Sequence, residues 1–142
     1  GKLTEVLDKI RSYWGGMLDL GAVTFWEEYD PFVPKEEQYD MYGDHFGKSL
    51  CHAWAASPIY FLAKYFAGLD LVNKDGVTYV LKPQMQYFTD LDCTLPVGSD
   101  GTVRLAWDGE CLEVIADAEG GVLELGEEKI SLVRGETRRV KI

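Results

Sequence analysis

The chain has 142 residues, of which 46% are hydrophobic and 27% are charged. That length usually corresponds to one domain, and that composition can bury a core. The formal net charge of −10 argues against nucleic acid and anionic membrane surfaces as partners, because like charges repel, whereas neutral ligands such as sugars stay open. No apolar stretch approaches the ~20 residues of a membrane-spanning helix. Because the first residue is Gly1 and no basic and apolar leader follows it, we expect missing sequence upstream.

The three cysteines, Cys51, Cys93 and Cys111, form no CxxC pair. An odd number without that spacing predicts neither a disulfide framework nor a zinc site. Pairing of Cys93 with Cys111 across strands stays an alternative. The favoured interpretation is that all three are free thiols that pack as small hydrophobic groups.

Helical periodicity opens the chain. An apolar stripe predicts a helix over residues 3–18, made by Leu3, Val6, Leu7, Ile10, Trp14, Met17 and Leu18. Gly15 and Gly16 are expected to weaken its end or to let another backbone approach. Residues 21–30 are predicted to be extended or turn-rich, and the prolines that follow exclude a continuing helix. The polar stretch 31–48 is then a long loop, which its aromatic residues predict to be ordered and packed over something.

A second helix is predicted from Ser49, a suitable N-cap, to Gly68, a suitable C-terminal stop. The intervening residues are apolar on nearly all sides, so this helix should be buried. Pro58 predicts either a kink or a new helix that Ser57 caps. Two helices cannot cover their own apolar faces. The first half of the chain should therefore pack on the second half, on a second copy in a homodimer, or on polypeptide upstream.

Beyond Asn73 the hydrophobic period changes to two, which is typical of strands. Strands are predicted at residues 77–82, 85–88, 102–107, 111–116, 121–125, 128–133 and 136–142, joined by turns such as DGE and RGE. Short strands with tight turns favour an antiparallel β-sandwich. The predicted fold class is therefore α+β, with a helical domain at residues 1–73 and an antiparallel sandwich at residues 74–142.

Two motifs in the first half are specific enough to compare with a family. The first runs Trp14-Gly15-Gly16-Met17 and then Gly21-Ala22-Val23-Thr24-Phe25-Trp26-Glu27, and the second is Ser49-Leu50-Cys51-His52-Ala53-Trp54 followed by Ser57-Pro58. In order and spacing they resemble the late barrel segment of bacterial α-L-rhamnosidases. The β region, with Pro83 and Leu95-Pro96, is similar to the terminal sandwich of that family. The resemblance covers nearly the whole chain, although Val23 stands where the family usually has a threonine.

The resemblance implies a C-terminal fragment: the last helices of an (α/α)6 barrel followed by an antiparallel β-sandwich. The parent enzyme would hydrolyse terminal α-L-rhamnose from glycosides with inversion. Glu27 would be its general base, and His52 and Trp26 would bind the sugar. The family's general acid lies in an acidic motif far upstream that this chain lacks, so the fragment is expected to be inactive alone. No cofactor or metal is expected; the expected partners are a rhamnose-containing glycoside and the upstream part of the same polypeptide.

Inverting hydrolysis sets chemical requirements on these residues. One carboxylic acid protonates the leaving oxygen while a second carboxylate, ~6.5–9.5 Å away, activates water. Glu27 must therefore be ionised, which requires polar partners among its aromatic neighbours. In an extended segment Glu27 can face the pocket while Trp26 and Glu28 face away. His52, expected in the first turn of a helix, would be a neutral imidazole that bonds a sugar hydroxyl.

Without the resemblance, ordinary interpretations are favoured. Glu27 and Glu28 would be a solvated pair, His52 a satisfied core residue, and the tryptophans core packing. A calcium loop is disfavoured, because the aspartates near the long loop lack its spacing: Asp30, Asp40 and Asp44. The main alternative function is a non-catalytic carbohydrate-binding or structural sandwich with a helical collar. A different sugar hydrolase or phosphorylase on the same barrel is another, and a bacterial cytoplasmic or periplasmic location fits equally.

Overall fold

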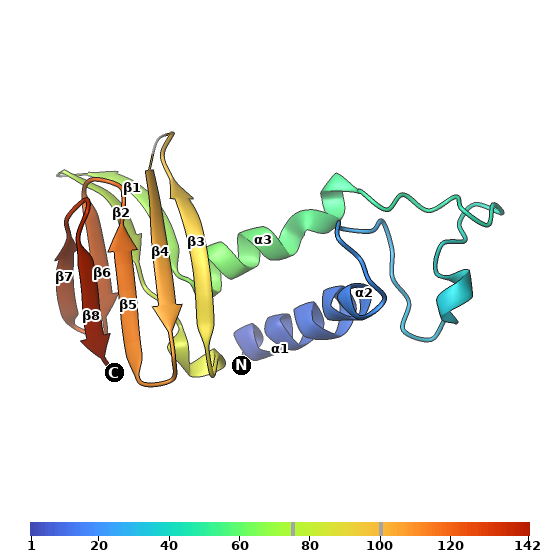
Figure 1. Ribbon diagram of the computed structural model, residues 1–142, viewed down its shortest axis with the longest axis horizontal. Helices are drawn as coiled ribbons and strands as arrows, with labels where there is room; N and C mark the ends of the chain where they lie inside the picture. The colour runs from blue at the N-terminus through green and yellow to red at the C-terminus, as the bar shows by residue number, and fades with distance from the viewer. Residues whose placement is uncertain (75, 100) are drawn as a thin grey trace. The chain divides into compact units, whose positions relative to one another are not determined.

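The structure is a computed structural model that describes residues 1–74, 76–99 and 101–142. The chain divides into two compact units, Gly1–Tyr60 and Phe61–Ile142 (Figure 1). Helices and a long loop make up the first unit, and two β-sheets dominate the second. The fold class is therefore α+β, as predicted. None of the described helices is both long enough and apolar enough to cross a membrane.

The boundary between the units lies earlier than the one predicted at residue 73. Ala63 and Ala67, at the end of the second helical segment, pack against the core of the sandwich together with Leu69. Leu69 also begins the first strand, β1 (Leu69–Lys74). The change of hydrophobic period near Asn73 thus falls inside a strand and does not mark the edge of a compact unit.

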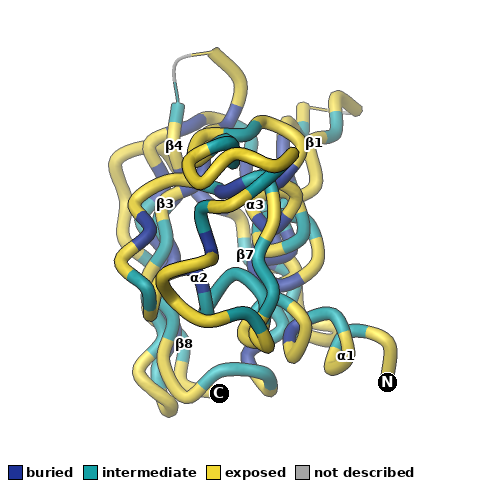
Figure 2. Tube along the Cα trace, turned by 90° about the vertical axis from the view of Figure 1, so that its right-hand side faces the viewer, coloured by how far each residue is buried: buried dark blue, intermediate teal, exposed yellow. Residues whose placement is uncertain are grey.

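The first unit opens with one continuous helical run, which confirms the helix predicted over residues 3–18. It consists of α1 (Lys2–Lys9), a π-helical turn (Ile10–Trp14) and α2 (Gly15–Asp19). Leu7 and Met17 are its buried side chains, and most of the run is half-buried or exposed (Figure 2). A π-helical turn within an α-helix is uncommon and often lies at a functional site. Here it contains two aromatic residues of the candidate pocket described below.

The long loop that follows is ordered, as predicted. It contains a 3-10 turn (Lys35–Glu37), and its anchor is Gln38, which is 2% exposed. The Gln38 amide donates to the carbonyls of Asp30 at 2.5 Å and Val33 at 2.8 Å. Because a buried amide without partners is costly, these bonds tie residues 30–38 of the loop together.

The second helical segment begins later than predicted. It runs through a 3-10 turn (Ala53–Ala56), α3 (Ser57–Phe61) and a π-helical turn (Leu62–Phe66). Ser49 is not its N-cap, because residues 49–52 are drawn into backbone hydrogen bonds with the segment around Glu27. Pro58 lies in the first turn of α3, where its missing N–H costs no helical bond. Gly68 ends the segment as predicted: its φ is +74°, and a Cβ there would lie 2.1 Å from the carbonyl oxygen of Lys82.

Within its described residues the second unit is a sandwich of two four-stranded sheets, ordered β1-β2-β6-β7 and β3-β4-β5-β8. The remaining strands are β2 (Val77–Leu81), β3 (Leu91–Val97), β4 (Gly101–Trp107), β5 (Cys111–Ala116), β6 (Gly121–Leu125), β7 (Glu128–Leu132) and β8 (Thr137–Lys141). Neighbouring strands are antiparallel except β2 and β6, which run parallel. The prediction of a wholly antiparallel sandwich is wrong at that pair, where the hairpin β6–β7 returns to the first sheet.

Sequence reasoning misses β1 and β3 and places a strand at residues 85–88, where the chain forms a 3-10 turn (Met85–Tyr87). β3 contains Pro96, which lacks the N–H that a central strand must donate. The proline is tolerated because β3 is an edge strand. β1 is the edge of the other sheet, so its pattern is weaker than that of a strand with two neighbours.

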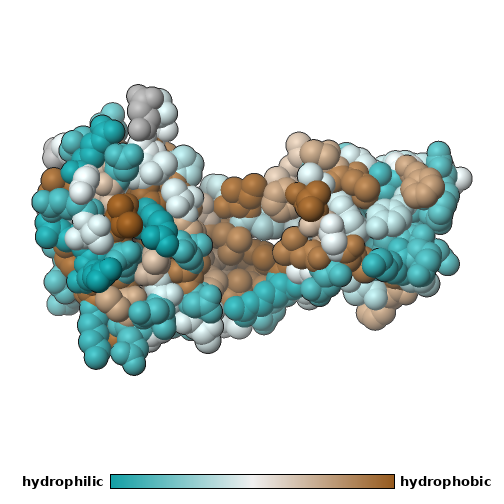
Figure 3. Space-filling view, viewed as in Figure 1, coloured by the Kyte–Doolittle hydropathy of each residue, from teal (hydrophilic) through white to brown (hydrophobic). Residues whose placement is uncertain are grey.

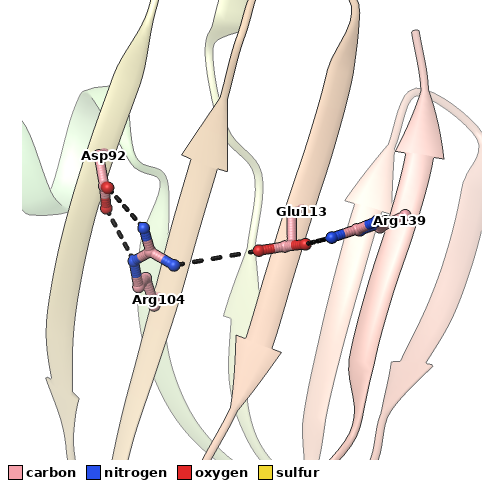
Figure 4. A network of polar contacts seen from close by, with 4 residues as sticks. All are labelled: Asp92, Arg104, Glu113 and Arg139. Carbon is pink, nitrogen blue, oxygen red and sulfur yellow. Dashed lines mark hydrogen bonds and ion pairs between the residues drawn. The ribbon is translucent and has the colours of Figure 1, made fainter.

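The sandwich core is continuous between the two sheets. Its fully buried side chains include Tyr79, Leu81, Val103, Leu105, Leu112, Val114 and Leu123. The outer face of the β3-β4-β5-β8 sheet carries a charged network instead, and in Figure 3 hydrophilic residues are interspersed there with apolar ones. There, Arg104 bonds Asp92 through two nitrogens at 2.9 and 2.5 Å and lies 3.9 Å from Glu113, which accepts from Arg139 at 2.6 Å (Figure 4). These charges join four adjacent strands.

All three cysteines are free thiols. Cys93 packs against the core, whereas Cys111 lies on the face of β5 opposite to the buried Leu112. The strands of Cys93 and Cys111 are separated by β4. Pairing of these two cysteines is therefore excluded in this fold, because the side chains lie on opposite faces and one strand apart.

Candidate functional site

The two motifs of the first half meet in the first unit. The N–H of Glu27 donates to the carbonyl of Ser49 at 2.8 Å, and the N–H of His52 donates to the carbonyl of Phe25 at 2.8 Å. The hydroxyl of the threonine in the first motif donates to a carbonyl of the second. These bonds resemble a short ladder, although neither segment is assigned as a regular strand. They bring the Glu27 and His52 side chains together.

The side chain of Glu27 is 8% exposed, and both of its carboxylate oxygens are bonded. Oε1 accepts from the Tyr42 hydroxyl at 2.8 Å, and Oε2 accepts from the N–H of Ser49 at 3.2 Å. Glu28 is exposed, and Trp26 is buried in the core of the unit. Glu27 is therefore the shielded acid of the pair, whereas Trp26 and Glu28, which a strict alternation would place on one side, differ in burial.

The surroundings of Glu27 hold its pKa below the ordinary value of 4.5, chiefly through the hydrogen bond from Tyr42. Desolvation opposes this shift, while the Ser49 N–H and the nearby His52 and Lys48 lower the pKa further. The carboxylate is consequently ionised at neutral pH and can accept a proton, as a general base must.

His52 lies beside this carboxylate and keeps 27% of its side chain exposed. Its Nδ1 is 3.7 Å from Oε2 of Glu27, too long for a hydrogen bond but close enough for attraction when the imidazole is protonated. The imidazole is 4.4 Å from the ring of Trp54, between centroids. The backbone of His52 is extended and precedes the turn that begins at Ala53. The prediction that His52 lies in a first helical turn is therefore wrong.

Glu27 lines an open pocket of about 230 Å³ together with Lys9, Tyr13, Trp14, Trp54 and Ala55. Trp54 is 72% exposed, which is unusual for so large an apolar side chain. Trp14 is fixed by a 2.8 Å hydrogen bond from its indole to the carbonyl of Ala55. The pocket combines aromatic surfaces with a few polar groups, as small-molecule sites do.

Close packing behind the pocket depends on Gly16. A Cβ at this position would lie 2.4 Å from ring atoms of Tyr29. The backbone N–H of Tyr29 donates to the hydroxyl of Tyr13 at 2.9 Å, and the two rings meet edge to face with centroids 5.7 Å apart. The glycine thus admits a side chain, where the sequence predicted a weakened helix end or an approaching backbone. This contact joins the π-helical turn to the chain just after Glu27.

The structure does not bring Trp26 to the pocket. Trp26 is 4% exposed and packs with Met17 and Ala22, and its ring meets that of Tyr39 at 5.6 Å between centroids. Its burial gives no support to the prediction that Trp26 binds the sugar; it underlies the segment of Glu27 instead. The exposed tryptophan beside Glu27 and His52 is Trp54.

Sequence reasoning gave no role in this site to several of its residues, among them Trp54 and Tyr42. Trp54 could have been predicted as a site residue, because it lies two residues after His52 within the same motif. Tyr42 was visible only as one aromatic residue of the long loop, and no spacing connects it with Glu27, 15 residues earlier. Its contact depends on a tight turn that the sequence places poorly.

The aspartates considered for calcium have other local roles. Asp30 and Asp44 each accept the backbone N–H two residues later, at 2.9 and 3.1 Å, and Asp40 contacts His45 at 2.5 Å. Among the described residues there is no cluster of three or more side chains that could hold a metal ion.

No protein-family model and no curated protein sequence matches this chain.

Proposed function

We propose that this chain is the C-terminal part of an inverting glycoside hydrolase of the α-L-rhamnosidase type, and that Glu27 is its general base. The observation that carries the proposal is the meeting of the two motifs. Residues that are 22 positions apart place a shielded, ionised Glu27 beside His52 and an exposed tryptophan. A solvated surface acid would need neither that shielding nor partners for both oxygens.

In the proposed reaction, Glu27 takes a proton from a water molecule as that water attacks the anomeric carbon. The tether to Tyr42 and Ser49 fixes the direction of the carboxylate and leaves lone pairs for the water, because an ionised carboxylate has about four acceptor positions. The leaving oxygen must be protonated on the opposite face by a second carboxylic acid. We assign that acid to polypeptide upstream of Gly1, so this chain alone should not turn over an aryl α-L-rhamnoside.

The sugar ring would lie against Trp54, whose exposed face offers an apolar surface to the ring carbons. The imidazole of His52 contacts the ring of Trp54 and can donate one hydrogen bond to a sugar hydroxyl or accept one from it. Lys9, at the edge of the pocket, lies 5.0 Å above the ring of Tyr13 and adds a donor. These side chains can orient one monosaccharide relative to Glu27.

The helical segments of the first unit would be the last helices of the (α/α)6 barrel. Leu18, Val23 and Ile59 are 66%, 94% and 60% exposed, more apolar surface than a small stable unit usually leaves open. In the proposed enzyme, upstream helices of the same polypeptide cover this surface and complete the site.

A second candidate function is sugar binding by the sandwich alone. The sandwich has an open groove of about 1110 Å³ whose lining includes Trp107, Gln84 and Gln86, together with the paired Lys82 and Glu124. Aromatic and amide side chains in one groove are suitable for a polar, hydroxylated ligand. This observation favours the non-catalytic module, in which the helical unit would have no chemical role.

The four tryptophans separate these two functions, because they lie in different places: Trp14, Trp26, Trp54 and Trp107. We would titrate the ¹⁵N-labelled chain with L-rhamnose, with D-glucose as the control sugar, and follow the indole N–H signals. The proposed site predicts saturable shifts of Trp54 and Trp14 with L-rhamnose, while Trp26 and Trp107 stay in place. A shift of Trp107 alone would support the binding module, and no shift at molar sugar would contradict both.

A further inference from the structure

An unusual local conformation among the described residues is the turn at Tyr42 and Gly43. Met41 and Asp44 exchange both backbone hydrogen bonds, at 3.0 and 2.9 Å, around these two residues. The φ angles of Tyr42 and Gly43 are +54° and +82°. Two consecutive positive φ values across a two-residue loop define a type I′ turn.

Tyrosine is a poor residue for this turn. Position one of a type I′ turn favours asparagine, aspartate or glycine, because other side chains are strained at positive φ. Within the described residues, Tyr42 is the sole non-glycine residue with a positive φ. Backbone strain of this kind persists only where the surrounding structure enforces it, and it concentrates at functional sites.

Burial does not account for Tyr42 either, since the residue is 81% exposed. What anchors it is the hydroxyl, which donates to Oε1 of Glu27 at 2.8 Å. The ring spans from an exposed turn to a shielded carboxylate. Neither turn propensity nor apolar packing therefore explains a tyrosine at this position, whereas its bond to Glu27 does.

We propose that Tyr42 is a positioning residue for Glu27, held on a strained type I′ turn so that its phenol fixes one carboxylate oxygen while the Ser49 N–H fixes the other. The role rests on the proposed function, in which Glu27 activates water. A carboxylate tethered at both oxygens cannot rotate, so the lone pairs directed at the water keep one orientation. The charged and titratable groups around the pair are His52 and Lys48 beside Glu27, and Glu28 near Tyr42.

The bond acts on both partners, which gives two independent measurements. The Tyr42 hydroxyl lowers the pKa of Glu27, and Glu27 in turn raises the pKa of Tyr42 above its ordinary value of 10.0. Removing either partner should move the pKa of the other toward its ordinary value. One measurement lies in the acid range and the other in the alkaline range, so acid unfolding of the chain does not prevent the test.

We would measure the pKa of Glu27 by carboxyl ¹³C NMR, and through the Ser49 amide signal, in the 142-residue chain. Tyr42→Phe keeps the ring and the strain but removes the hydroxyl, and it should raise the pKa of Glu27. Tyr42→Asn suits the turn better and is too short to replace the phenol, so it should raise the same pKa without lowering the Tm. Tyr39→Phe removes a hydroxyl from the same loop and should leave the pKa of Glu27 unchanged.

In the reciprocal measurement, Glu27→Gln should lower the pKa of Tyr42. An unchanged Glu27 pKa in Tyr42→Phe, or an unchanged Tyr42 pKa in Glu27→Gln, overturns the positioning role. These results are independent of hydrolysis. If both shifts occur but the longer polypeptide does not cleave rhamnosides, the proposed function fails and the tether stands. If Glu27→Gln abolishes cleavage while Tyr42→Phe shifts nothing, the base assignment stands and the tether fails.

Discussion

The sandwich and the helical unit differ in how far their large apolar side chains are buried. In the sandwich, Tyr79, Leu81 and Leu105 are fully buried between two sheets that pair strand by strand. In the helical unit, the core cluster is Met17, Ala22 and Trp26, while large apolar side chains stay at the surface. Figure 3 shows apolar side chains at the surface over α3.

This difference separates a packed structural region, the sandwich, from the region that contains the candidate site, the helical unit. The sandwich buries a continuous apolar core between its two sheets, and the charges of its outer face form pairs across strands. The helical unit instead contains a strained turn, a shielded carboxylate and exposed aromatic rings. Such features are disfavoured locally and concentrate at functional sites.

The comparison predicts its largest effect when the two regions are expressed apart. Residues 57–142, which keep α3 and the π-helical turn that follows it, should be monomeric and unfold in one sharp thermal transition. Residues 1–67 should aggregate or remain molten, because their apolar faces lack cover. Differential scanning calorimetry and near-ultraviolet circular dichroism would measure both. A sharp transition from monomeric residues 1–67 would break the comparison.

The same substitution in the two regions should have unequal effects on the full chain. Leu105→Ala, at a fully buried position in β4, should lower the free energy of unfolding of the sandwich by ~2–5 kcal/mol. Leu18→Ala, at a position that is 66% exposed, should change stability by no more than ~0.5 kcal/mol. Urea denaturation would compare them. Equal losses would mean that Leu18 is packed as closely as Leu105 and would contradict the comparison.

Acid should destabilise the sandwich through carboxylates with lowered pKa values. Backbone N–H groups of Cys111 and Glu110 lower the pKa of Asp108, Arg104 lowers that of Asp92, and Lys82 and Lys129 lower that of Glu124. A lowered folded-state pKa stabilises the fold above the ordinary value, 3.8 for aspartate and 4.5 for glutamate, and this contribution disappears as the pH falls through the folded-state pKa.

The Tm of residues 57–142 should therefore be nearly constant from pH 7 down to about 5 and should fall below about 4. Asp108→Asn should flatten that fall, because one linked proton is removed, while Asp117→Asn, at an exposed ion pair, should alter it less. A Tm that rises toward low pH would contradict the assigned pKa directions. This is the smallest of the three effects, since each group is near the surface.

Much of the fold could be predicted because period and turn chemistry are local. The strands at β2, β4, β5, β6 and β7 lie within a residue or two of their predicted positions, since each alternates between core and surface. β3 was not predicted because it contains Pro96. A strand can contain a proline when it lies at the edge of a sheet, and strand order in the whole sheet decides which strands are edges. The parallel pairing of β2 with β6 likewise depends on strand order.

The site residues that lie within the two motifs could be predicted from the sequence. The residue that only the tertiary fold brings to Glu27 could not. Glu27 and His52 lie in the two motifs, and the fold brings them within 3.7 Å of each other. The resemblance implies a substrate-binding role for Trp26, yet its side chain is 4% exposed and packs in the core of the helical unit. Tyr42 reaches Glu27 only through a positive φ at a tyrosine, which local propensity argues against.

The most direct test of the central claim is a side-by-side measurement of kcat and KM for Glu27→Gln and Glu28→Gln in the polypeptide that includes the upstream region, with an aryl α-L-rhamnoside as substrate. Glu27→Gln keeps the shape of the side chain but removes the base, so kcat should fall by ~10²–10⁴-fold while KM changes much less. Glu28→Gln, at an exposed position, should stay within a few fold of the unaltered enzyme. An inactive Glu28→Gln beside an active Glu27→Gln would contradict the account.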